Sequence, residues 1–279
     1  MGWKHRARLT LNEALGRFGY ELVWLNRPSH LIGFLPLQET IEKARAAKMS
    51  LCDWIDQQYN EPGATPRTIE QLRTLGVFQG PIDTVCEIGP GSGRFLEKIL
   101  QHCKPRQYEI YEPEADWSKW LEAHYPVKRR ATDGKSLSVT ASDTIDLVTS
   151  FRVFVAIPFL VTLCYLNEMV RVVRPGGTLV FDVVTEECMD EETTDKWLAC
   201  ASTYPVVTSR RYITQFFEQR GFSLLGNFFM PLRPGQSEYF VYKAPLTKGA
   251  LRGVVQASMK PAIGIEPLPK RLGMPGFQS

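Results

Sequence analysis

Three glycines and an acid within one short stretch could hold a polar ligand. Glu87 ends a short apolar run, and Gly89, Gly91 and Gly93 follow at alternate positions. Because glycine has no Cβ, a ligand can approach the backbone of Gly89 and Gly91 closely. A helix that begins near residue 92 would turn its first N–H groups toward that ligand. The stretch therefore predicts the binding turn of a nucleotide-binding α/β unit.

The spacing of these glycines separates two classes of cofactor. A nicotinamide site typically has the pattern Gly-x-Gly-x-x-Gly, which Gly89, Gly91 and Gly93 do not follow. We expect the Glu87 carboxylate to point toward the turn, where it would attract a cation and repel a pyrophosphate. A cationic ligand is favoured, and an NAD(P)-dependent Rossmann oxidoreductase is the alternative.

Alternating apolar runs over residues 79–244 predict the elements that would position this turn. Strands are expected at 82–87, 108–111, 127–131, 145–149, 178–184, 222–230 and 238–242. Helices are expected at 92–102, 116–124, 158–172, 190–199 and 210–220. This alternation is typical of a mostly parallel sheet with helices on both faces. The last two strands have no helix between them, so they should form an antiparallel β-hairpin. The predicted fold class is α/β, with a Rossmann-like sheet of seven strands.

The rest of the chain is expected to form extensions of that domain. Residues 1–78 should be an N-terminal helical cap, and residues 245–279, rich in proline and glycine, a flexible basic tail. The cap is predicted to contain helices at 11–18, 38–58 and 68–76 and a strand at 20–25. The formal net charge is +3, and both ends are basic. Solvated ends are the simpler interpretation, and weak peripheral contact with a membrane is the alternative.

Composition predicts a cytoplasmic protein with reduced thiols. The six cysteines are scattered without a Cys-x-x-Cys pair and do not cluster with the four histidines, so no metal site is expected. No cleavable signal pattern is seen at the N-terminus. The most apolar stretch, 153–166, is shorter than the roughly 20 residues that a bilayer requires, and Pro158 interrupts it. No transmembrane segment is therefore expected.

Several motifs together resemble the class I S-adenosylmethionine-dependent methyltransferases. They are the glycine turn with Glu87, the acid Glu112 that ends the second strand, Asp133-Gly134 after the third strand, Arg174-Pro-Gly-Gly177 before the fifth, and the terminal hairpin. The resemblance covers about residues 80–244. It implies the fold and S-adenosyl-L-methionine as cofactor, and it says little about the methyl acceptor.

The resemblance also implies a role for the residues of the glycine turn. Glu87 would lie under the methionine amino group of the cofactor, and the three glycines would form the floor of the site. Glu112 would accept hydrogen bonds from both ribose hydroxyls, as an acid at that position does for NAD. A solvated acid at the end of a strand is the alternative for Glu112.

Roles for residues after the third and fourth strands follow in the same way. Asp133 would accept a hydrogen bond from the adenine amino group, and Gly134 would let the backbone approach the base. Since Asp-Gly is a common turn signal, a purely turn-forming pair is the alternative. Ser150 and Phe151 would lie beside the methyl donor.

The acceptor side has fewer signals. Asp182 and Glu186 follow the fifth strand and are the candidate catalytic residues, with structural or solvated roles as the alternative. Arg152 could hold an anionic group, and His30 could reach in from the cap. The Asn/Asp-Pro-Pro-Tyr/Phe signature is absent after the fourth strand, where residues 150–153 read Ser-Phe-Arg-Val, and this disfavours a nucleic-acid base. No acidic metal triad stands out.

A looser resemblance bears on the acceptor. Residues 59–63 and 133–137 look like segments of bacterial methyltransferases associated with polysaccharide and glycosyl-transfer genes. It favours a hydroxyl of a sugar, a glycan or another small molecule as acceptor. A non-catalytic methyltransferase-like binding module is a further alternative, and the oligomeric state stays open.

Overall fold

The structure is a computed structural model that describes residues 35–200 and 205–247. The chain divides into two units, Met1–Pro245 and Leu246–Ser279, and the fold described here belongs to the first. The helix and strand predicted before residue 26, His30 and most of the predicted tail lie outside the described residues. The division of the first unit into a cap and a catalytic domain at residue 78 stays a prediction.

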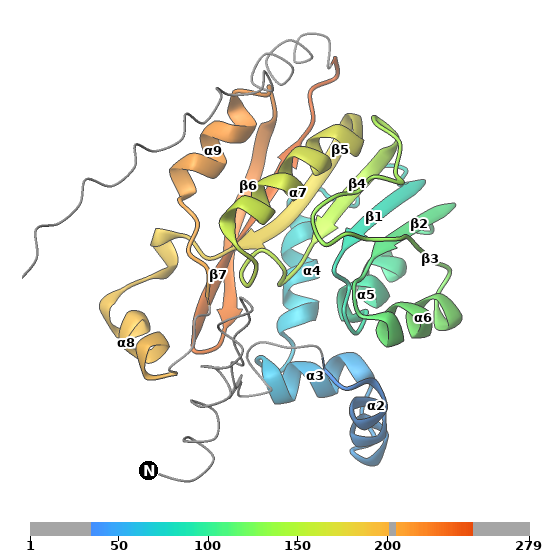
Figure 1. Ribbon diagram of the computed structural model, residues 1–279, viewed down its shortest axis with the longest axis vertical. Coiled ribbons are helices and arrows are strands. Elements are labelled where there is room, and N and C mark those ends of the chain that lie inside the picture. Colours follow the sequence, from blue (N-terminus) through green and yellow to red (C-terminus); the bar gives the residue numbers. More distant parts are fainter. Residues whose placement is uncertain (1–34, 201–204, 248–279) are drawn as a thin grey trace, which may run out of the picture. The chain divides into compact units, whose positions relative to one another are not determined.

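A seven-stranded sheet in the order β3-β2-β1-β4-β5-β7-β6 organises this unit (Figure 1). Its strands are β1 (Thr84–Ile88), β2 (Gln107–Tyr111), β3 (Lys128–Arg129), β4 (Ile145–Ser150), β5 (Val173–Val183), β6 (Ser223–Leu232) and β7 (Gly235–Lys243). The first five strands pair in parallel, and β7 runs antiparallel to both β5 and β6. The predicted α/β fold, with its mostly parallel sheet and C-terminal antiparallel hairpin, is confirmed.

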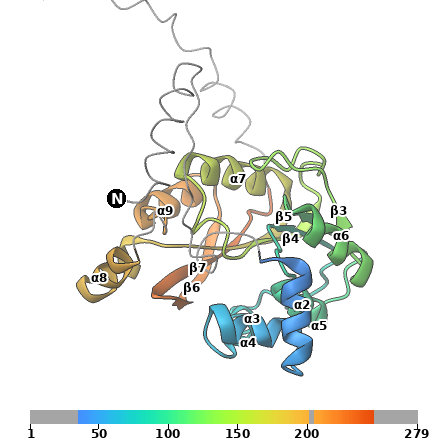
Figure 2. The same cartoon turned by 60° about the horizontal axis from the view of Figure 1, so that its bottom comes forward.

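Helices cover both faces of the sheet and bury a separate apolar core on each (Figure 2). One core contains side chains of α4 (Ala64–Thr74), α5 (Arg94–His102) and α6 (Ala115–His124). The other contains side chains of α7 (Phe159–Val172) and α9 (Arg210–Glu218). A 3₁₀ turn, η1 (Glu186–Cys188), and α8 (Glu191–Ala199) come between β5 and α9.

The connection from β3 to β4 is the exception to this strand–helix alternation. Residues 130–144 contain no helix, although they join two strands that belong to the same parallel sheet. The segment is held instead by side chains of β2 and α7, which are described below.

The cap differs from its prediction at two points. The helix expected at 68–76 begins earlier, as α4 (Ala64–Thr74), because the first turn of a helix tolerates a proline such as Pro66. The helix expected at 38–58 is two helices, α2 (Leu37–Ala46) and α3 (Leu51–Tyr59). Lys48 takes a left-handed φ of 56°, and the Ser50 side chain accepts a hydrogen bond from the Asp53 amide and so begins α3. The prediction of one continuous helix was wrong because it overlooked Ser50 as an N-cap.

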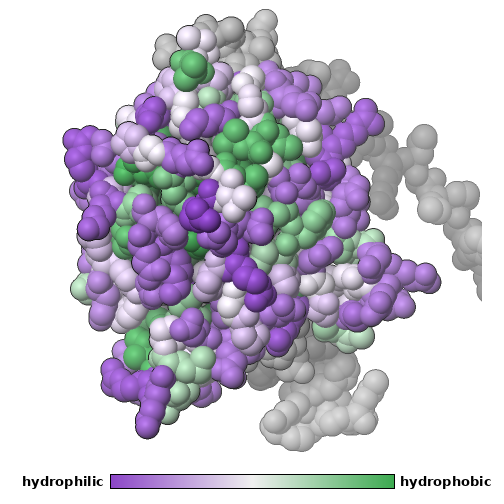
Figure 3. All heavy atoms as spheres, turned by 180° about the vertical axis from the view of Figure 1, so that it is seen from behind, coloured by the Kyte–Doolittle hydropathy of each residue, from purple (hydrophilic) through white to green (hydrophobic). Residues whose placement is uncertain are grey.

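Figure 3 shows the side of the molecule that is turned away in Figure 1, where hydrophobic side chains form separate patches among hydrophilic ones. None of the described helices is long and apolar enough to cross a bilayer.

Candidate active site

The glycine turn lies between the end of β1 and the start of α5, and its three glycines differ in their surroundings. All three have positive φ angles, of 63° at Gly89, 55° at Gly91 and 78° at Gly93. A Cβ on Gly89 would lie 2.5 Å from Val153 Cγ2, and one on Gly93 would lie 2.4 Å from Leu121 Cδ2. A Cβ on Gly91 would meet nothing within 4 Å. The fold itself therefore requires Gly89 and Gly93, and Gly91 is the glycine whose open face a ligand could approach.

This difference predicts unequal effects of two matched substitutions. Gly93→Ala should lower the free energy of unfolding by about 2–4 kcal/mol, because a left-handed alanine costs about 1–2 kcal/mol and crowding Leu121 adds to it. Gly91→Ala should cost only about 1–2 kcal/mol, since its Cβ enters open space. Urea unfolding of both variants measures the difference, and equal losses would contradict the packing role of Gly93.

Glu112 joins the glycine turn to the end of β2. Its Oε2 accepts a hydrogen bond of 2.7 Å from the Gly91 amide, and its Oε1 accepts one of 2.9 Å from the Glu114 amide. Burial raises the pKa of Glu112, and the two backbone donors oppose that shift. The side chain is 5% exposed, so it is not the solvated acid of the alternative interpretation. Gly91 and Glu112 thus form one contact at the carboxyl edge of the sheet.

Glu87 lies deeper at the same edge. It is buried, and its Oε2 accepts a hydrogen bond of 2.6 Å from the Tyr108 hydroxyl on β2. Burial raises the pKa of Glu87 to about 7, and the charge of Glu112 adds to this shift. A carboxylate in this setting gains from a nearby cation, because a positive charge would stabilise its ionised form.

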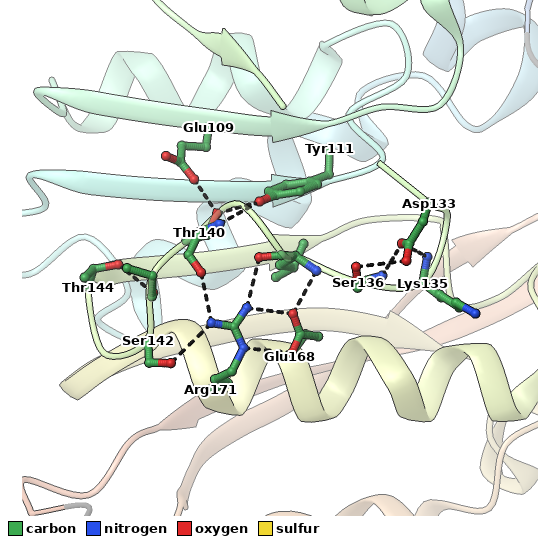
Figure 4. Close-up of polar contacts among 12 residues, drawn as sticks. Glu109, Tyr111, Asp133, Lys135, Ser136, Thr140, Ser142, Thr144, Glu168 and Arg171 are labelled. Carbon is green, nitrogen blue, oxygen red and sulfur yellow. Dashed lines mark hydrogen bonds and ion pairs between the residues drawn. The ribbon is translucent and has the colours of Figure 1, made fainter. Parts of the chain in front are cut away.

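Asp133 and Gly134 form an exposed turn after β3 (Figure 4). Asp133 Oδ1 accepts hydrogen bonds from the amides of Lys135 (3.0 Å) and Ser136 (2.7 Å), and Oδ2 accepts one from Ser136 Oγ (3.0 Å). Gly134 has a φ of 76°, and a Cβ there would meet nothing within 4 Å. Asp133 and Gly134 therefore form a turn, as expected for an Asp-Gly pair. The backbone of Gly134 is also open to a ligand.

The end of β4 carries a buried hydroxyl group. Ser150 lies beside Ile88 in the register of β1 and β4, next to the glycine turn. Its Oγ is buried and has no hydrogen-bond partner among the described residues. Phe151 is also buried, and its ring stacks on Phe95 of α5 with centroids 4.4 Å apart. Such an orphaned hydroxyl marks a place where a ligand atom could complete a hydrogen bond.

The two candidate catalytic acids lie in different surroundings. Asp182 is fully buried, and its oxygens accept hydrogen bonds from the Arg152 amide (2.6 Å) and from Ser237 Oγ (2.8 Å). The Arg152 guanidinium turns inward to Ser237 and to the Pro231 carbonyl, rather than toward an anionic substrate. Glu186 is exposed, and it accepts a hydrogen bond of 2.8 Å from the Arg210 amide at the start of α9. One acid is thus buried and the other exposed, and their catalytic roles stay predictions.

A buried ion pair, which the sequence did not indicate, ties the cap to the glycine turn. Asp56 of α3 is fully buried and lies 2.7 Å from the Nη1 atom of Arg94, the first residue of α5. The same carboxylate accepts hydrogen bonds from the amide (2.7 Å) and the hydroxyl (2.8 Å) of Thr65. The sequence could have drawn attention to Arg94, because it directly follows Gly93. It could not have indicated Asp56 as its partner, which lies 38 residues away in the sequence.

Comparison with known proteins identifies the family. Residues 44–226 match the protein family described as the methyltransferase domain. The chain belongs to this family. Its cofactor is S-adenosylmethionine, and the chain is a class I S-adenosylmethionine-dependent methyltransferase. Membership of this family argues against the oxidoreductase alternative. No curated protein matches the chain.

Solved structures share the fold of this methyltransferase at low sequence identity. A chain of the complex between the Haloferax volcanii Trm112 methyltransferase activator and a methyltransferase has a TM-score of 0.52 and 16% identity, covering 74% of this chain and 98% of that one. A sarcosine dimethylglycine methyltransferase from Galdieria sulphuraria has a TM-score of 0.50 and 9% identity, covering 66% and 85%. The [4+2]-cyclase SpnF has a TM-score of 0.51 and 12% identity, covering 68% and 83%.

Features of this methyltransferase fit a cofactor with a sulfonium, an amino acid part and an adenosine part. The faces of Gly91 and Gly134 are open, and Ser150 Oγ is an orphaned buried hydroxyl. Glu87 is a buried carboxylate that a cationic group would stabilise. No group of three histidines, cysteines, aspartates or glutamates among the described residues could hold a metal ion.

Proposed function

We propose that this methyltransferase transfers a methyl group to a hydroxyl of a sugar, a glycan or another small molecule. The contact between the Gly91 amide and the Glu112 carboxylate carries the cofactor part of this proposal. It joins the open glycine to an acceptor of hydrogen bonds at the carboxyl edge, where ligands of open α/β sheets bind.

In this proposal each residue of the edge has one task. Glu87 attracts the amino group of the cofactor, Glu112 accepts from its ribose, and Asp133 accepts from its adenine. Gly91 and Gly134 leave room for the ligand, and Ser150 and Phe151 lie beside the methyl donor.

When bound, S-adenosylmethionine supplies a methyl group that is already activated on a sulfonium. The task of the protein is therefore mainly alignment, which can account for about 7–11 kcal/mol of a reaction barrier. Of the two candidate bases, Glu186 is the one that an acceptor can reach, because Asp182 is fully buried. Hydrogen bonds from the α9 backbone outweigh burial and lower the pKa of Glu186, which makes it a weak base. Asp182 is buried and accepts hydrogen bonds from the Arg152 amide and from Ser237 Oγ, so we assign it a positioning role for these two residues.

The acceptor class rests on the segments that resemble polysaccharide-associated methyltransferases. One of them, residues 59–63, begins at the last residue of α3, close in sequence to Asp56 of the buried pair with Arg94. Asn60 is buried there, and its side-chain amide lies beside Asp56 and Arg94. This segment therefore lies close to the glycine turn, where an acceptor must approach.

An acceptor screen tests the proposal. The protein is incubated with S-adenosylmethionine and pools of sugars, glycans, small alcohols and amines, and mass spectrometry follows S-adenosylhomocysteine and products heavier by one CH₂ group. We expect turnover with a hydroxyl-bearing pool. Loss of that turnover in Glu186→Gln would identify Glu186 as the base despite its lowered pKa. Products only from amines would contradict the hydroxyl assignment. Cofactor binding without turnover in any pool would favour the non-catalytic module.

The pKa of Glu87, about 7, predicts a pH-dependent affinity for the cofactor. Burial raises the pKa of Glu87 from 4.5 to about 7 in the folded protein. The contribution of the protonated side chain to the stability of the cofactor-free fold is therefore full below pH 4.5 and is lost as the pH rises through about 7, where Glu87 ionises. An ammonium group nearby stabilises that ionised form, so the affinity for S-adenosylhomocysteine should rise several-fold as pH increases through about 7.

Calorimetry across this pH range checks the prediction with two controls. Glu87→Gln should bind with little dependence on pH. 5′-Methylthioadenosine, which lacks the amino acid part, should show no such rise with the unaltered protein. An equal rise for both ligands would contradict the assignment of Glu87 to the amino group.

A further inference from the structure

Helix α7 presents polar side chains to the segment that replaces a helix between β3 and β4. Tyr165, Glu168 and Arg171 recur at intervals of three residues and therefore lie along one side of the helix. Burial raises the pKa of the Tyr165 hydroxyl, and a side-chain hydrogen bond with Thr132 opposes that shift. Glu168 and Arg171 contact residues 137–142 (Figure 4). The turn with Asp133 and Gly134 lies between these two points of attachment.

Arg171 and Glu168 hold the end of that turn through the backbone. The Arg171 guanidinium donates to the carbonyls of Leu137 (2.9 Å) and Thr140 (2.9 Å) and to Ser142 Oγ (3.2 Å). Glu168 accepts from Arg171 Nε (2.8 Å) and Nη2 (2.7 Å), and its Oε2 also accepts from the Leu137 amide (2.9 Å). The ion pair therefore fixes both the N–H and the C=O of Leu137.

A second attachment holds the far side of the segment against β2. The Thr140 amide donates to the Tyr111 hydroxyl (3.0 Å), and Thr140 Oγ1 donates to the buried Glu109 carboxylate. Arg130 pairs with the same carboxylate. The segment that carries the turn is therefore fastened both to α7 and to β2.

The direction of the Asp133 carboxylate depends on this framework. Three hydrogen bonds from Lys135 and Ser136 tie the carboxylate to the turn itself, and the turn continues directly into Leu137. We propose that Glu168 and Arg171 are positioning residues for adenine recognition, acting through the turn that presents Asp133 to the adenine amino group. The inference rests on the proposed function, in which Asp133 accepts from that group.

Discrimination between two ligands tests this role. Calorimetry compares S-adenosylhomocysteine with its counterpart that has purine in place of adenine and so lacks the amino group. The unaltered protein should prefer the adenine compound by about tenfold or more, since a hydrogen bond to a charged acceptor contributes at that level. Arg171→Lys, which cannot span both carbonyls, should reduce this preference several-fold. Exchange of the Lys135 and Ser136 amides, measured without ligand, should become faster.

The chain offers a matched control on α4. Glu70 and Arg73 form an exposed ion pair at the same i,i+3 spacing, with Nε–Oε2 and Nη2–Oε1 distances of 2.8 and 2.6 Å. Arg73→Lys should leave the preference for the adenine compound and the two amides unchanged. Glu168→Gln serves as the second variant if Arg171→Lys fails to fold, and it should reduce the preference in the same direction.

The outcomes separate this inference from the function on which it rests. If the variants bind both ligands more weakly in parallel, with the preference unchanged, the ion pair is merely structural and the inference is wrong. If the unaltered protein binds both ligands equally, Asp133 does not read the amino group, which overturns the inference while cofactor binding stands. If it binds neither, the assignment of the cofactor site fails as well.

Discussion

Replacing Asp56 by alanine should lower the free energy of unfolding by about 3–5 kcal/mol, the range observed when one partner of a buried ion pair is removed. Asp56 is 0% exposed, and the Arg94 side chain is 13% exposed. Burial and the charge of Arg152 lower the pKa of Arg94, whereas Asp56 acts to raise it. Without Asp56, a largely buried guanidinium loses its counter-charge, and Thr65 loses the acceptor for its amide and hydroxyl.

Urea unfolding of Asp56→Ala measures this loss, and the same helix supplies a control. Asp53 is exposed in the first turn of α3. Asp53→Ala removes only a favourable charge near a helix N-terminus, so it should cost about 1 kcal/mol or less. If the two variants lose similar stability, the pair of Asp56 and Arg94 does not hold the cap to the glycine turn.

Glu112→Ala should weaken binding of S-adenosylhomocysteine by about 1–3 kcal/mol, because the ribose hydroxyls and the Gly91 amide lose their acceptor. The effect on folding should be smaller, since burial raises the pKa of Glu112 and the carboxylate is itself costly to bury. The variant thus separates cofactor binding from stability, which Asp56→Ala does not.

Calorimetry and thermal unfolding of the same preparations check this expectation. Glu114→Ala is the control, because it removes a half-buried carboxylate two residues further along the chain. It should leave the affinity nearly unchanged. Equal affinity in Glu112→Ala and the unaltered protein would remove Glu112 from the proposed site.

Local patterns were sufficient to predict much of the fold. Each of the seven predicted strands overlaps an observed one. For all except the short, exposed β3, an apolar run bounded by turn residues can be recognised without knowledge of its partners. β5 begins earlier than predicted, since it includes the Arg174-Pro-Gly-Gly177 segment, which reads as a loop. The break between α2 and α3 was missed because it depends on a single capping hydroxyl.

Contacts between distant residues could not be predicted in the same way. Gly89 and Gly93 are required by Val153 and Leu121, which no spacing rule connects to the turn. Asp182 lies in a buried hydrogen-bond network rather than at an accessible surface. Its carboxylate accepts a hydrogen bond from the hydroxyl of Ser237, which is 55 residues further along the chain. Sequence spacing therefore indicated which residues border the candidate site, whereas packing partners decide which of them a ligand can reach.

The position of β7 has a consequence for how the chain is made. β7 is the last strand of the described part of the chain, yet it lies between β5 and β6. A ribosome must therefore synthesise the chain to Lys243 before either neighbour gains its partner. Until then, the nascent chain exposes the unpaired edge of β5, with its apolar Leu179 and Phe181, to other chains. Translation that stops before β7 should yield a product that depends on chaperones rather than a shortened enzyme.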